Sequence, residues 1–174
     1  MLFRSSIMIE TGDRKGEADF YATLGSVSQS VCEYGKAEEF QRKALAIRKE
    51  IGDRKGEAAC YGNLGTVYYS RRESAKAEEY LNNALAMERR LGNKKGEAAS
   101  YRNLGTVFQS LDEYGKAEKY QRQALAISKE IGDRKTEAAC YGSLGTVYHS
   151  HGECAKAEEF QRKALAIRDR KSVV

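Results

Sequence analysis

Three side chains that commonly bind transition metals, His149, His151 and Cys154, lie close together in the sequence. Zinc prefers imidazole and thiolate ligands, but a structural zinc site needs about four of them, usually supplied as two spaced pairs. No second pair at a recognised zinc spacing accompanies this group. The sequence therefore predicts neither a metal site nor any other cofactor.

Adjacent glutamates are the other candidates for chemistry, because paired carboxylates can act as general acid and general base. They occur at 38–39, 78–79 and 158–159, but the corresponding residues at 118–119 are Glu and Lys. A carboxylate position that also accepts Lys is typical of a solvated helix face. Since no nucleophile motif or acid–base constellation is recognisable either, the sequence predicts a protein that is not an enzyme.

The cysteines match no disulfide framework by their spacing. Cys60 and Cys140 occupy equivalent places in a repeated sequence where the other copies have Phe20 and Ser100, which indicates a packing role. Reduced thiols are typical of the cytoplasm, so we expect a cytoplasmic protein.

A repeated sequence must position any functional residue of this chain. The heptad Gly-Asp-Arg-Lys-Gly-Glu-Ala begins at residues 12 and 52, and close variants of it begin at residues 92 and 132. Self-similarity at one fixed spacing predicts a solenoid of stacked supersecondary units. We expect a remnant of a preceding second helix at 1–11 and four repeats at 12–51, 52–91, 92–131 and 132–174, the last with a short tail.

The composition favours helices throughout. Proline is absent and 32% of the residues are charged, which is typical of all-α proteins. The net charge of +5 is spread over every repeat rather than gathered in a basic stripe, so nucleic-acid binding is not expected. Neither a signal peptide nor a membrane span is predicted.

Each repeat is expected to form two antiparallel helices. In the second repeat Asp53 can cap the first helix, and an apolar stripe then follows at helical spacing. Gly65 lies inside this helix and predicts close approach of a second helix, which carries the small residues Ala77 and Ala84. Gly92 suits the left-handed position that ends the second helix.

The pattern Tyr61-x2-Leu64-Gly65-x2-Tyr68, followed by Ala77 and Ala84, resembles the tetratricopeptide repeat signature. It recurs in phase in the other repeats, although the first has Ser28 in place of the second aromatic residue. The resemblance implies an all-α, right-handed α-solenoid of four antiparallel helix pairs after an N-terminal partial helix.

Two features depart from the usual signature. The period is longer than the common one of about 34 residues, and the proline near the end of the second helix is missing. This long form is similar to the repeats of G-protein-signalling-modulator (Pins-like) adaptors and of tetratricopeptide repeat protein 28-like arrays. Both comparisons imply a non-catalytic scaffold that binds protein partners.

Residues that vary among the repeats are free to contact a ligand, and many of them fall on one side of the first helices. The resemblance places this side in a concave groove that binds peptides. The predicted groove residues are Ala22, Thr23, Ser26, Gln29, Gly62, Asn63, Thr66, Tyr69, Arg102, Asn103, Thr106, Gln109, Gly142, Ser143, Thr146 and His149.

Within this groove the residue types suggest separate roles. Small side chains at the first positions let a peptide backbone approach, and Asn63 and Asn103 can both donate to it and accept from it. Tyr69 and Arg102 are the expected anchors, because interface hot spots are enriched in these types. The alternative is that these positions vary only because they face solvent.

Two functions follow from the sequence. The first is a scaffold that binds an extended or partly helical segment of a protein partner, away from membranes. The second is a structural spacer or a self-associating part of a longer array, since neither 1–11 nor 172–174 resembles a capping helix. End-to-end association of copies belongs to this second possibility.

Overall fold

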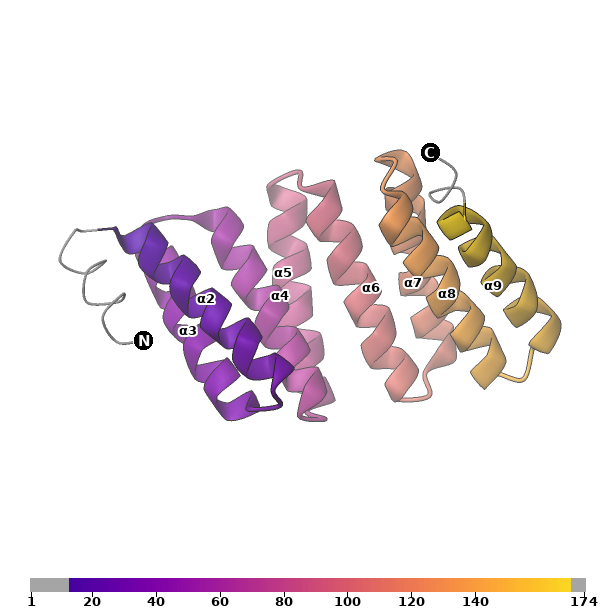
Figure 1. The fold of residues 1–174 in the computed structure, drawn as a ribbon, viewed down its shortest axis with the longest axis horizontal. Helices are drawn as coiled ribbons and strands as arrows, with labels where there is room; N and C mark the ends of the chain where they lie inside the picture. The colour runs from indigo at the N-terminus through magenta and orange to yellow at the C-terminus, as the bar shows by residue number, and fades with distance from the viewer. Residues whose placement is uncertain (1–12, 170–174) are drawn as a thin grey trace. The chain divides into compact units, whose positions relative to one another are not determined.

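A computed structural model of the chain describes residues 13–169, and every regular element in that range is a helix. In chain order (Figure 1) these are α2 (Arg14–Ser30), α3 (Tyr34–Glu50), α4 (Arg54–Ser70), α5 (Ser74–Arg90), α6 (Lys94–Ser110), α7 (Tyr114–Glu130), α8 (Arg134–Ser150) and α9 (Cys154–Asp169). The predicted all-α class is confirmed. The helix remnant expected at 1–11 and the end of the tail at 170–174 lie outside the described residues.

The first helix of each pair begins at a capping residue. The Asp13 carboxylate accepts a hydrogen bond of 2.8 Å from the Gly16 N–H, and Asp53 accepts one of 2.9 Å from Gly56. Asn93 and Asp133 cap α6 and α8 in the same way. These bonds satisfy amide groups that have no partner inside the helix, and they confirm the predicted caps.

The turns between helices use the left-handed backbone region at two kinds of position. After the second helices it is occupied by glycine, with φ of 72° at Gly52 and 65° at Gly92, as predicted. After three of the first helices it is occupied by larger residues, with φ of 61° at Cys32, 62° at Arg72 and 59° at Asp112. The sequence analysis missed these three, although the equivalent residue after α8 is Gly152, with φ of 82°.

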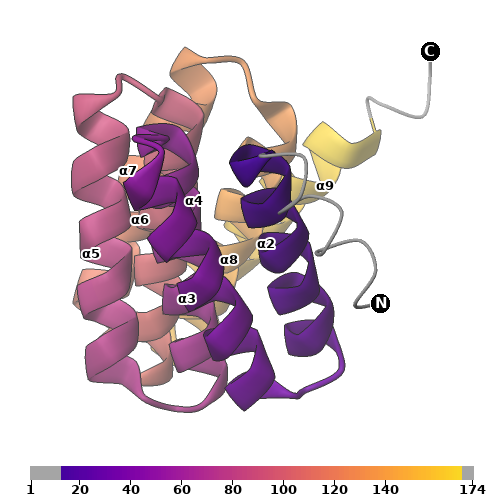
Figure 2. The ribbon, with the colours of Figure 1, turned by 90° about the vertical axis from the view of Figure 1, so that its left-hand side faces the viewer.

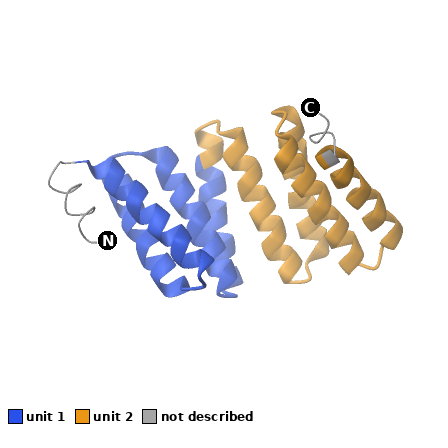
Figure 3. Cartoon of the chain, viewed as in Figure 1, with its two compact units in different colours: residues 1–87 blue, residues 88–174 orange. Residues whose placement is uncertain are grey.

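The chain divides into two compact units, residues 1–87 and 88–174 (Figure 3). In the first unit α3 packs against both α2 and α4, and α2 also contacts α4. Figures 1 and 2 both show α2 and α3 side by side. In the second unit α7 packs against α6 and α8, α8 against α9, and α6 contacts α8. Consecutive helices therefore pack in pairs, as predicted.

A glycine in each first helix lets the second helix approach closely. A methyl group at Gly65 would lie 2.6 Å from Leu81 Cγ and 3.3 Å from the Ala77 carbonyl oxygen. At Gly25 and Gly105 the side chains of Gln41 and Gln121 come equally close, with Nε2 at 2.6 Å in each case. The predicted reason for these glycines is confirmed.

Candidate functional site

The predicted groove residues lie on the first helices of the pairs, four each on α2, α4, α6 and α8. None of them is buried; all are half-buried or exposed. Contacts bring α2 beside α4 in the first unit and α6 beside α8 in the second. The structure thus gathers the residues of α2 with those of α4, which we call the first face, and those of α6 with those of α8, which we call the second face.

Side chains of the first face are held in place by hydrogen bonds between α2 and α4. Gln29 Nε2 donates to Thr66 Oγ1 at 3.3 Å and to Ser70 Oγ at 3.5 Å. Thr66 Oγ1 lies 2.8 Å from the Asn63 carbonyl oxygen, to which its hydroxyl can donate. This face therefore presents an ordered polar row to its surroundings.

The threonines of the second face bond only within their own helices. Thr106 and Thr146 donate to carbonyl oxygens of their own helices, those of Arg102 and Gly142, each at 3.1 Å. No heavy atom lies within 4 Å of where a side-chain carbon at Gly142 would stand. Within the described part of the chain, no hydrogen bond between α6 and α8 matches the one from Gln29 to Thr66.

Buried glutamines of the second helices reach the backbone behind these faces. Gln41 is 1% exposed; its Nε2 donates to the Ala22 carbonyl at 2.9 Å, and its Oε1 accepts from Asn63 Nδ2 at 3.3 Å. Gln121, fully buried, donates likewise to the Arg102 carbonyl at 3.1 Å, but its Oε1 is buried with no partner. The sequence analysis missed these residues, although Gln recurs at the same place in three of the four repeats.

A second group missed by the sequence analysis joins α3 to α4, and we call it the first joint. Tyr68 Oη donates to Glu38 Oε1 at 2.6 Å and accepts from Arg42 Nη2 at 2.7 Å. Arg71 forms an ion pair with the same glutamate. Burial opposes ionisation of Glu38, but the hydrogen bonds from Tyr68 and Arg42 and the two arginine charges outweigh it, so its pKa lies below its ordinary value.

The equivalent second joint connects α7 to α8. Tyr148 Oη donates to Glu118 Oε1 at 2.6 Å and accepts from Arg122 Nη2 at 2.9 Å. The hydrogen bond from Tyr148 lowers the pKa of Glu118, as does the one from Arg122. His151 stands where the first joint has Arg71, but its Nδ1 lies 3.0 Å from Glu153 Oε1 instead.

The expectation that the glutamate pairs form a solvated face is therefore wrong for Glu38 and Glu118. Each contacts a buried tyrosine of the next helix, and burial is the first cause that raises the pKa of Tyr68, to about 12. The expectation fits the neighbouring residue: Glu39 is exposed and pairs with Lys43 at 2.6 Å on its own helix. Both joints hold one helix pair against the next.

The cysteines fall into two classes. Cys32 and Cys154 are exposed, whereas Cys60 and Cys140 are at most 1% exposed on α4 and α8. Burial raises the pKa of both buried thiols to about 11. This position is a packing position, as predicted from its exchange with Phe and Ser.

His149 and His151, the histidines considered as metal ligands, are exposed. Across residues 13–169 no three side chains of His, Cys, Asp or Glu are grouped so that they would hold a metal ion. Among the described helices, none combines the length and the apolar character needed to cross a bilayer.

Comparison with known proteins places this architecture in a family. A family model described as "Tetratricopeptide repeat" matches residues 17–90 and 96–170. The chain belongs to the tetratricopeptide repeat family. These repeats are generally a non-catalytic interaction fold, and the chain is accordingly a protein-interaction scaffold. The finer likeness to Pins-like and protein 28-like arrays stays a prediction.

Solved structures share the fold at low sequence identity. BtubC (BKLC) from P. vanneervenii has a TM-score of 0.79 and 24% identity, over 98% of this chain and 79% of its own. Aspartyl phosphate phosphatase F from Bacillus subtilis has a TM-score of 0.89 and 19% identity, over 98% of this chain and 45% of its own. No curated protein matches the sequence.

A third solved structure contains a bound peptide. The Rap conjugation gene regulator of the plasmid pLS20, in complex with the Phr* peptide, has a TM-score of 0.78 and 20% identity, over 90% of this chain and 44% of its own. The chain spans less than half the length of this regulator and of the Bacillus phosphatase. At these identities the likeness concerns the fold alone.

Proposed function

We propose that the chain is a scaffold whose first face and second face each bind an extended or partly helical peptide segment of a protein partner. The observation that carries this proposal is the accessibility of the faces: the residues that vary among the repeats are all half-buried or exposed, so a ligand can reach them. The proposal is supported by the pLS20 regulator, which shares the fold and forms a complex with a peptide.

The polar groups suit a peptide backbone. The hydroxyls of Thr106 and Thr146 can donate to carbonyl oxygens of their own helices, so their oxygens remain available to accept from a peptide N–H. The side-chain amide of Asn63 donates one hydrogen bond to Gln41, and its Oδ1 can accept a hydrogen bond from the ligand. The faces thus offer both acceptors and donors, as recognition of the N–H and C=O groups of a peptide backbone requires.

Tyr69 on the first face and Arg102 on the second are proposed as the anchors. Both are half-buried, so each already rests against its own unit while part of the side chain stays accessible. Tyrosine and arginine are enriched among the few residues that dominate interface energetics, because each combines a large contact area with polar groups that can hydrogen-bond the partner. We place this activity in the cytoplasm, because all four cysteines are free thiols.

The test is a comparison of two double variants with the wild-type chain. Peptides that bind the wild type are selected from a displayed random library, and their dissociation constants are measured by fluorescence anisotropy. Tyr69→Ala with Arg102→Glu removes the anchor of both faces and should weaken binding at either one at least about tenfold, since each anchor contributes roughly 2 kcal/mol.

Tyr34→Ala with Arg134→Glu is the matched control, because it changes the same residue types outside both faces. It should leave the dissociation constants within about twofold, as expected of residues away from the interface. If the two double variants weaken binding equally, or neither weakens it, the faces are not the binding site.

A further inference from the structure

An apolar groove lies open on the outer side of the first helix pair. It has a volume of about 410 Å³ and is lined by Phe20, Leu24 and Val27 on α2, by Val31 directly after α2, and by Phe40 on α3. Val27 is 52% exposed and Val31 60% exposed. Exposed apolar side chains gathered in one groove mark a surface that another molecule covers.

The later repeats show what covers the equivalent surface. Val67 on α4 corresponds to Val27 and is fully buried, and Val147 on α8 is 2% exposed. In the first unit α3, a second helix, packs against α4; in the second unit α7, also a second helix, packs against α8. This surface of a first helix thus receives the second helix of the preceding pair.

The helix α9 is also the second helix of its pair, and its corresponding side is exposed. Residues 156–168 on α9 have the same sequence as residues 36–48 on α3. Leu45 of α3 is 8% exposed, whereas Leu165, its counterpart on α9, is 54% exposed. Likewise Gln41 is 1% exposed while Gln161 is exposed. The side of α3 that the next pair covers is therefore bare on α9.

We propose that α9 of one copy docks into the groove between α2 and α3 of a second copy, as α3 docks on α4. Leu165 supplies the apolar contact to Val27 and its neighbours. Such head-to-tail contacts use two different surfaces of each copy, so they leave one free surface at each end and extend into open chains.

The α9 surface and the groove also carry opposite charges at the places where α3 and α4 form an ion pair. At the α3–α4 junction Arg48 Nη1 lies 2.9 Å from Asp53 Oδ2, the capping carboxylate of α4. The corresponding pair between copies is Arg168 and Asp13, and both are exposed. An arginine meeting a capping carboxylate therefore fixes the register of the contact.

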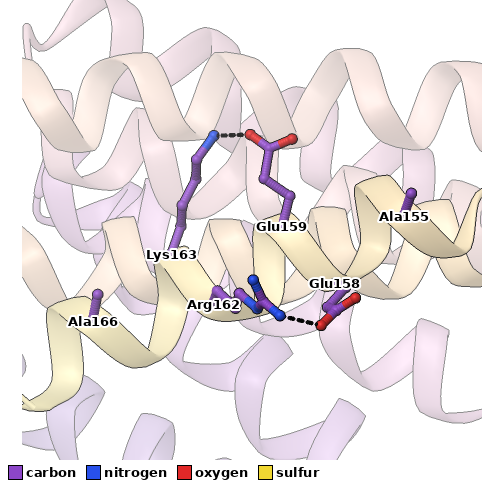
Figure 4. A pocket seen from close by; sticks show the side chains of 6 residues that line it. All are labelled: Ala155, Glu158, Glu159, Arg162, Lys163 and Ala166. Carbon is purple, nitrogen blue, oxygen red and sulfur yellow. Dashed lines mark hydrogen bonds and ion pairs between the residues drawn. The ribbon is translucent and has the colours of Figure 1, made fainter.

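Inside each unit an arginine of a second helix also lies over an aromatic ring of the following second helix. Arg42 lies 5.9 Å from the centre of the Tyr80 ring, and Arg122 lies 6.0 Å from that of Phe160. Between copies Arg162 would lie over Phe40 of the groove. On α9 its guanidinium pairs only along its own helix, with Glu158 at 2.5 Å (Figure 4), so it is accessible to a second copy.

One difference makes this contact weaker than the internal joints. Ser28 stands where α4 and α8 have Tyr68 and Tyr148, so the tyrosine that links Glu38 and Arg42 has no counterpart in the groove. Association is accordingly reversible and depends on concentration. This proposal uses surfaces other than the peptide-binding faces, so either can fail without the other.

Sedimentation velocity over a range of concentrations tests the proposal with the full chain. The wild type should form dimers and larger chains as its concentration rises. Val27→Glu and Leu165→Glu should each weaken association at least about tenfold, because each places a charge in the buried centre of the contact. Both residues are largely exposed in the single copy, so both variants should fold normally by circular dichroism.

Mixing the two variants gives the decisive result. The groove of Leu165→Glu and the α9 surface of Val27→Glu are both intact, so the mixture should form a dimer and nothing larger. Ile131→Glu is the control: Ile131 is 38% exposed in the turn before α8, and its variant should associate like the wild type. A mixture that stays monomeric, or equal effects of all three substitutions, would overturn the proposal.

A gain-of-function variant tests the register. Ser28→Tyr restores the missing tyrosine opposite Glu158 and Arg162 of the second copy and should tighten association about tenfold. A wild type that remains monomeric at high concentration would overturn the proposal. In that case, a change of hydrogen exchange in residues 1–12 of the Val27→Glu variant would indicate that these residues, and not a second copy, occupy the groove.

Discussion

The first joint and the second joint are built from the same tyrosine, glutamate and arginine, yet they differ in one partner. In the first, Glu38 is also paired with Arg71; in the second, the equivalent residue is His151, which pairs elsewhere. Three side chains therefore bond Glu38 directly, whereas two bond Glu118, to which Lys156 adds only its charge. Copies of one repeat can thus share a polar contact and still differ in its strength.

Removal of the glutamate should have the largest effect and should separate the joints. Glu38→Ala leaves Tyr68, Arg42 and Arg71 without their shared acceptor, and we expect a loss of about 3 kcal/mol in the stability of the first unit. Glu118→Ala leaves only two groups unpaired and should cost about 2 kcal/mol in the second unit. Hydrogen exchange measured by mass spectrometry reports each unit separately.

Glu39→Ala is the control for this comparison, because it removes an exposed carboxylate from the same helix. Its cost should stay within about 0.5 kcal/mol. Equal losses for Glu38→Ala and Glu118→Ala would mean that Arg71 contributes nothing to the first joint.

Removal of one hydroxyl should have a smaller and more similar effect in the two joints. Tyr68→Phe and Tyr148→Phe keep the buried ring and lose the hydrogen bond to glutamate, at a cost of about 1 kcal/mol each. A double-mutant cycle with Glu38→Gln or Glu118→Gln isolates the pairwise energy. A coupling energy near zero at either joint would show that its ring packing alone carries the stability.

Acid should weaken both joints, and its effect should be smaller than that of removing the glutamate or the tyrosine hydroxyl. The folded chain holds the pKa of Glu38 and of Glu118 below their ordinary value of 4.5. A depressed folded pKa gives stability that is present above the ordinary pKa and is lost as the pH falls through the folded one. Thermal melts between about pH 6 and pH 3 should therefore show a loss that Glu38→Gln with Glu118→Gln reduces.

The fold was predictable because each of its causes is local or periodic. Asp53 caps α4 through the N–H of a residue three positions away, and Gly65 marks the close approach of α5 within one repeat. The recurrence of these residues in phase in four repeats then predicted the same helix pair four times. Left-handed Cys32 and Arg72 escaped prediction, because a residue type other than glycine gives little signal for that conformation.

The joints could not be predicted in the same way. Tyr68 and Glu38 are 30 residues apart, and their contact depends on which side of α3 meets α4. The pair 38–39 corresponds to Glu118 and Lys119 in the third repeat. Because Lys replaces only the second residue, treating the pair as one unit concealed the separate role of Glu38. The groove face was placed through the family resemblance, whereas the bond from Gln29 to Thr66 depends on side-chain conformations that no pattern records.

The two buried thiols give each unit its own kinetic reporter. Cys60 and Cys140 occupy equivalent places, and with a pKa of about 11 each is almost entirely protonated near neutral pH. Alkylation requires the thiolate and access to it, so a reagent modifies either residue only when its unit opens. The ratio of the two labelling rates therefore measures how often the first unit opens relative to the second, in the unaltered chain.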